Sequence, residues 1–149
     1  MMTKSSYLLR ESLVSAVING LISVAFFLGT FSGIDPVPVW GLGNYAFDFI
    51  PQSFAVALMS ALVPGFLARM ALKSGKFGSR PVPGTGTIVV RAFAWALGAL
   101  AVGAGAAALI LWLVAAVSIP WSPAFAIKIV YGALLGAVVT HRSVGRLIG

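Results

Sequence analysis

The sequence predicts an all-α integral membrane protein with four transmembrane helices. Of its 149 residues, 60% are hydrophobic and 9% are charged, a composition too apolar for an ordinary soluble domain. Long stretches also lack any charged side chain: residues 12–34, 49–68 and 92–127. A bilayer core of about 30 Å needs about 20 helical residues, so the first two stretches each fit one span.

The third stretch is too long for one span and contains its own stop signal. Pro120 and Pro123 end a helix and favour a turn, which divides the stretch into two spans. We therefore expect one membrane domain, residues 1–149, made of two αα hairpins. The predicted spans are residues 13–31, 52–72, 89–118 and 123–140.

The first span is polar along one face. At about 100° per residue, its polar side chains fall within an arc of roughly 120°. They are Glu11, Ser12, Ser15, Asn19, Ser23 and Thr30. Because such a face is unfavourable in lipid, we expect it to turn towards other helices, a partner chain or a water-filled path. We interpret the span as an anchor, because no clear small-residue cleavage site for a signal peptide accompanies it.

The connection at residues 32–51 combines prolines with several aromatic residues, which are typical of the headgroup region. It is predicted to form an extracytoplasmic flap at the interface. We interpret Asp35 and Asp48 as solvated loop residues. The alternative is that the two carboxylates attract cations at the mouth of a path.

The second span contains Pro64 and Gly65. Proline removes a backbone hydrogen bond, so this pair predicts either a hinge or simply a kink satisfied by neighbouring helices. Residues 73–88 follow as a polar, turn-rich cytoplasmic loop. Its glycine-threonine run at residues 84–87 lacks the lysine of a phosphate-binding loop, which argues against nucleotide binding.

The third and fourth spans contain small residues at helical spacing. Gly103, Gly132 and Gly136 would let helix backbones approach closely, so we predict that they pack against other helices. Lys128 lies about one turn inside the outer boundary and is expected to extend outward to the headgroups. A buried ion pair with Asp48 is the alternative.

A weak internal match leaves open a parallel repeat of the two hairpins. Ile-Pro-Gln-Ser at residues 50–53 resembles Ile-Pro-Trp-Ser at residues 119–122, and each follows a span that opens with an arginine. Such a repeat would be related by an axis along the membrane normal.

The basic residues predict the orientation. Nine of the ten lie before the first span, around the second connection or after the fourth span, and Lys128 is the exception. This positive-inside pattern places both termini in the cytoplasm, and we expect a multi-pass protein of a bacterial inner membrane. The net charge of +7 then favours anionic lipid at the cytoplasmic face over nucleic acid. There is no cysteine, so no disulfide or thiolate site can form.

The sequence offers no catalytic constellation. His141 is the single histidine, and the acidic residues are only three, so we expect no enzyme, metal site or cofactor. We predict an oligomeric transporter or channel subunit for a small solute or ion, with Glu11, Ser15, Asn19 and Ser23 lining the path. The alternative is a non-catalytic accessory or assembly subunit that offers the same face to another membrane protein. Either role implies a homo-oligomer or a membrane-protein partner.

Overall fold

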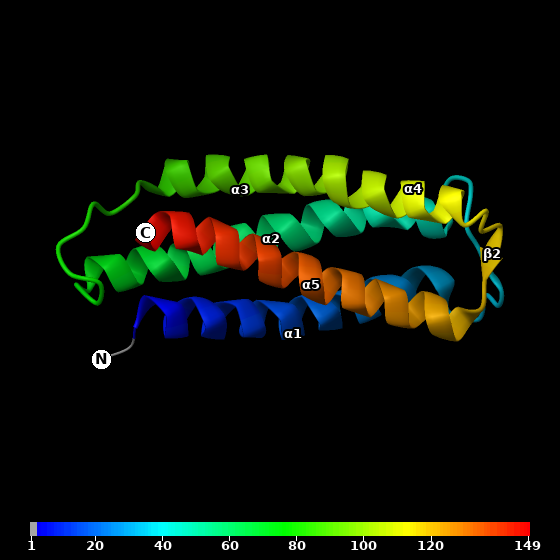
Figure 1. Ribbon diagram of the computed structural model, residues 1–149, viewed down its shortest axis with the longest axis horizontal. Helices are drawn as coiled ribbons and strands as arrows, with labels where there is room; N and C mark the ends of the chain where they lie inside the picture. Colours follow the sequence, from blue (N-terminus) through cyan, green and yellow to red (C-terminus); the bar gives the residue numbers. More distant parts are fainter. Residues whose placement is uncertain (1–2) are drawn as a thin grey trace.

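The fold is built almost entirely from helices, as the computed structural model of residues 3–149 shows (Figure 1). Its elements, in chain order, are α1 (Lys4–Phe31), β1 (Val37–Pro38), α2 (Tyr45–Lys73), α3 (Thr85–Ala99), the π-helical turn η1 (Leu100–Ala104), α4 (Gly105–Leu113), β2 (Ser118–Ile119) and α5 (Trp121–Ile148).

Four segments are long and apolar enough to cross a bilayer. They are α1, α2, the continuous rod α3–η1–α4, and α5, each of 28 or 29 residues. At 1.5 Å per residue each is about 42 Å long, which exceeds a hydrocarbon core of about 30 Å. The prediction of an all-α protein with four membrane-spanning helices is therefore confirmed.

The helix boundaries differ from the predicted spans. Residues 45–51, predicted as part of the flap, are the first turns of α2, because this helix begins at Tyr45, after the N-cap Asn44, and passes through Pro51. Asp48 lies in its first turn, where the helix dipole favours a negative charge. The third segment ends at Leu113 instead of residue 118, and α5 continues to Ile148.

The helices run alternately up and down, so both described ends of the chain and the 74–84 connection lie at one end of the bundle (Figure 1). We call this the terminal end. The connections around β1 and β2 form the opposite end, where the two strands pair antiparallel, with Val37 opposite Ile119. An aromatic cluster that includes Phe27, Tyr45 and Trp121 fills the space beneath them.

The packing order differs from two simple hairpins. The most extensive contacts join α1 to α5, followed by α2 to α5 and α2 to α3, whereas α1 touches α2 only lightly and α3 touches α5 only lightly. The rod α3–α4 lies along α2 at the edge of the bundle (Figure 1). The predicted hairpin pairing is therefore not confirmed, because the two helices of each predicted hairpin, α1 with α2 and α3 with α5, touch only lightly.

The sequence match behind the predicted repeat does not join equivalent positions. Pro51 lies inside α2, whereas Pro120 is the residue that precedes α5. The buried polar residues of these two parallel helices follow another offset than the sequence match does. Lys128 comes 80 positions after Asp48, Thr140 comes 80 positions after Ser60, and all four are buried. The parallel repeat stays a prediction.

Candidate functional site

The polar face of α1 is buried inside the bundle. Five of its six predicted members have between 0% and 8% of their surface exposed: Glu11, Ser12, Ser15, Asn19 and Ser23. Thr30 is exposed, and its hydroxyl donates to the carbonyl oxygen of Phe26 in its own helix. The face meets α5 and α2 of the same chain, so hydrogen-bonding partners are available without a second protomer.

The centre of this face is a cluster of hydroxyls from three helices. Thr140 Oγ1 lies 2.7 Å from Ser15 Oγ and 2.8 Å from the carbonyl oxygen of Ser60. That carbonyl is available because Pro64, four residues later, has no N–H to donate. Yet α2 continues through Pro64 and Gly65 as one helix, and a Cβ at Gly65 would lie 2.9 Å from a methyl group of Ile88 in α3. The predicted hinge thus lies at a closely packed contact.

Asn19, one turn after Ser15 in α1, also hydrogen-bonds to this cluster. Its Nδ2 donates to the carbonyl oxygen of Ser15 at 2.7 Å and to Ser60 Oγ at 2.8 Å. Since the first of these acceptors is a carbonyl, the amide orientation is fixed and Oδ1 must point elsewhere.

The glycines of α5 make room for these groups. A Cβ at Gly132 would overlap the Ser23 hydroxyl and lie 3.1 Å from the Asn19 carbonyl oxygen. A Cβ at Gly136 would lie 2.5 Å from Asn19 Nδ2. Both glycines therefore serve the contact between α1 and α5 within one chain. Gly103 in η1 makes room for a side chain of α5 in the same way, because a Cβ there would overlap the hydroxyl of Tyr131.

Gln52 extends the polar contacts towards the other end of the bundle. Its Nε2 donates to Ser23 Oγ at 2.8 Å and to the carbonyl oxygen of Lys128 at 3.2 Å. Sequence reasoning missed this residue because it took position 52 as the start of the second span. The available signal was the spacing of Asp48, Gln52 and Ser60, which places all three on one face of a helix that starts earlier.

A buried ion pair lies next to Gln52, at the end of this line of polar contacts. Lys128 Nζ donates to Asp48 Oδ2 at 2.9 Å, and Nζ also lies 3.6 Å from the ring centroid of Phe49. The prediction that Lys128 extends to the headgroups is wrong, as is the interpretation of Asp48 as a solvated loop residue. The alternative ion pair is the one formed, because α2 and α5 run parallel and bring positions 48 and 128 together. Asp35 is exposed and accepts a hydrogen bond from the backbone N–H of Trp121 at the start of α5.

These contacts form one buried polar network, which we define by the residues Ser15, Asn19, Ser23, Gln52, Ser60 and Thr140, with the Lys128–Asp48 pair at one end. Two carbonyl oxygens in it are buried without a hydrogen-bond partner among residues 3–149, Asn19 Oδ1 and Gln52 Oε1. The hydroxyl of Ser12 is in the same state. Most buried polar atoms in proteins have a hydrogen-bond partner, so these three oxygens are exceptions.

A cavity of about 140 Å³ reaches the network from the side, between α1 and α2. We call it the α1–α2 groove. Its polar lining comes from Glu11, Ser15, Asn19 and Ser60, and apolar residues such as Ile18 border it. Glu11 is 7% exposed, and no hydrogen bond or ion pair reaches it from residues 3–149. The accessible surface of the groove is almost entirely apolar, and Glu11 and Asn19 are among the few polar residues beside it.

In the described part of the chain, no three side chains from His, Asp and Glu come together as metal ligands would. His141 lies on the exposed surface near the terminal end. No protein family, curated protein or solved structure matches this chain.

Proposed function

We propose that this chain is a membrane transport subunit, a transporter or channel, and that its path follows the buried polar network of α1, α2 and α5. The observation that carries the proposal is the unpartnered Asn19 Oδ1, a buried acceptor beside a groove that also contains Glu11. Polar groups deep in a membrane protein are costly, and those with unused hydrogen-bonding capacity favour a role in binding.

The chemistry of the free atoms favours a particular class of solute. Asn19 Oδ1 and Gln52 Oε1 can accept but not donate, and an ionised Glu11 has the same character. The amide nitrogens are already used within the network. We therefore expect a small cation or a neutral solute that donates hydrogen bonds, and not an anion.

The network alone is closely packed, so a solute needs space that the α1–α2 groove supplies in part. Because α1 and α2 are in light contact, a separation of these two helices would widen the groove, at the cost of the hydrogen bonds that Ser60 and Gln52 form with α1. Pro64 lines the α2 side of this groove, and Pro64 with Gly65 is the proposed hinge. A homo-oligomer could shield the groove from lipid while α1 and α2 separate.

The orientation belongs to the proposal as well. We place the terminal end in the cytoplasm of a bacterial cell, since nine of the ten basic residues lie towards that end. Glu11 then lies towards the cytoplasmic mouth, and the Lys128–Asp48 pair lies towards the outer one.

The test is solute flux into liposomes that contain the purified protein, using a panel of monovalent cations, small polyols and small amines. We expect flux of one class, with Asn19→Leu reducing it about tenfold or more, because one lost buried hydrogen bond is worth about 1–3 kcal/mol. Glu11→Gln should reduce cation flux more than flux of neutral solutes. Val17→Leu, on the exposed side of α1, is the matched control.

The second candidate is an accessory subunit of a larger membrane complex. The same groove supports it, because a polar side chain from a partner helix lying against α1 and α2 could enter the groove and donate to Asn19 Oδ1. If no solute gives flux above empty liposomes and Asn19→Leu releases a co-purifying membrane protein, the accessory role replaces transport.

A further inference from the structure

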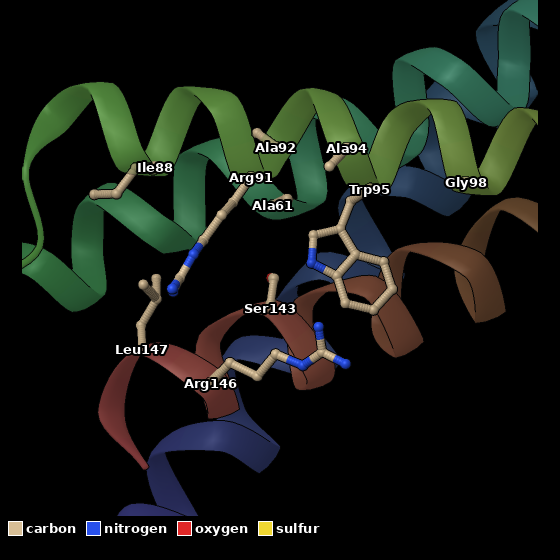
Figure 2. Close-up of a pocket in the computed structure, with 10 residues that line it drawn as sticks. All are labelled: Ala61, Ile88, Arg91, Ala92, Ala94, Trp95, Gly98, Ser143, Arg146 and Leu147. Atoms are coloured by element: carbon tan, nitrogen blue, oxygen red, sulfur yellow. The ribbon is translucent and has the colours of Figure 1, made fainter.

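A second cavity, of about 390 Å³, lies between α3 and α5 near the terminal end of the bundle. Its polar lining consists of Arg91 and Trp95 from α3 and of Ser143 and Arg146 from α5. Figure 2 shows the Arg91 side chain extending from α3 towards α5, and the Arg146 guanidinium beneath the indole of Trp95. The distance from that guanidinium to the ring centroid is 5.5 Å.

The two arginines lack acidic partners. The chain has three acidic residues, and none of them lines this cavity. The Lys128–Asp48 pair is the single ion pair formed among residues 3–149. The indole N–H of Trp95 is also not used in any hydrogen bond of the described residues. Two free guanidinium groups and an N–H donor around one space favour an anion with several acceptor oxygens.

The rest of the cavity is apolar. Ala61, Ile88, Ala92 and Leu147 form its walls, and the light contact between α3 and α5 leaves it open along α3. Towards the middle of the rod lies Gly98, where an added Cβ would meet no atom within 4 Å. The two arginines thus lie between apolar walls, with Ile88 and Leu147 on the terminal side and Gly98 towards the centre of the bundle, which matches an amphiphile better than a free inorganic anion.

We propose that this cavity binds one anionic phospholipid, with its phosphate held by Arg91 and Arg146 and an acyl chain lying along α3 beside Gly98. Arginine binds phosphate oxygens in a bidentate manner, and the indole N–H of Trp95 is a further donor for the same headgroup. The site gives the general attraction of a basic surface for anionic lipid a defined position. None of the residues that define the buried polar network lines this cavity, so the lipid site does not depend on the transport proposal.

The test is native mass spectrometry of the purified protein in a neutral detergent, titrated with phosphatidylglycerol or with phosphatidylcholine of the same acyl chains. We expect one tightly bound phosphatidylglycerol, preferred about tenfold or more. Arg91→Gln/Arg146→Gln should abolish the preference. Arg10→Gln/Arg142→Gln removes the same charge from two exposed arginines outside the cavity and should preserve it.

Two further arms separate lipid from free phosphate. Gly98→Leu fills the apolar part without changing the charge and should weaken lipid binding, whereas excess inorganic phosphate should leave the bound lipid in place. Equal loss in both arginine double variants would overturn the proposal, because bulk charge would then explain the preference. Displacement by inorganic phosphate together with unchanged binding to Gly98→Leu would instead indicate a site for a small anion. If the Arg91/Arg146 variant fails to fold, lipid binding to Gly98→Leu becomes the deciding measurement: unchanged binding would overturn the proposal.

Discussion

Lys128 and Asp48 form an ion pair inside the bundle, with Nζ 2.9 Å from Oδ2 and with side chains that are 1% and 8% exposed. The pair joins α2 to α5, and the rings of Tyr45 and Phe49 lie against the ammonium group. Breaking such a pair leaves one buried charge without compensation, whereas replacing both partners is much less costly.

The first prediction concerns this pair. Asp48→Asn or Lys128→Met alone should lower the free energy of unfolding by about 3–5 kcal/mol, and the double variant should recover most of that loss. Thermal unfolding of the purified protein in detergent measures the effect. Lys73→Gln, an exposed change at the terminal end, should alter stability little. Additive losses in the double variant would show that the two residues do not act as a pair.

The second prediction concerns the contact between α1 and α5. Gly132→Leu/Gly136→Leu places side chains where Ser23 and Asn19 already lie. Each substitution should therefore lower the free energy of unfolding by about 1–3 kcal/mol or more. Unfolding of the monomer in a denaturing detergent is the measurement. Val130→Leu, at an exposed position of the same helix, should behave like the wild type. If the double variant changed only the oligomer size, these glycines would instead contact a second chain.

The third prediction concerns orientation. Single cysteines at Ser5 and Ser79 should be shielded from an impermeant thiol reagent in intact cells, and cysteines at Ser32 and Ser122 should react, because all four positions are exposed at opposite ends of the bundle. The chain has no cysteine of its own, so the background is clean. Ser143 is unsuitable as a probe, since it is buried. Reaction at Ser79 from outside would reverse the orientation.

The sequence predicts the fold class because hydropathy and charge are local properties. It also predicts the polar face of α1, since helical spacing alone places Ser15, Asn19 and Ser23 on one side. What it could not predict depends on contacts between distant segments. The choice between an outward Lys128 and a buried pair required the register of α2 against α5.

The role of Gln52 required knowledge that α2 starts at Tyr45, before its proline at position 51. The preference of α1 for α5 over its neighbour α2 likewise follows from the complementary shapes of Gly132, Gly136 and the polar face. No periodicity within one segment contains that information.

The claim that the α1–α2 groove leads a solute to the polar network is tested most directly at Ser60. This residue lines the groove and accepts a hydrogen bond from Asn19, and cysteine there is nearly isosteric with serine. In liposomes, a small cationic thiol reagent should react with Ser60→Cys and block flux. It should not react with Val17→Cys, which lies on the exposed apolar side of α1. A thiol that faces lipid has no water in which to ionise to the reactive thiolate. An unreactive Ser60→Cys in protein that still conducts its solute would contradict the account.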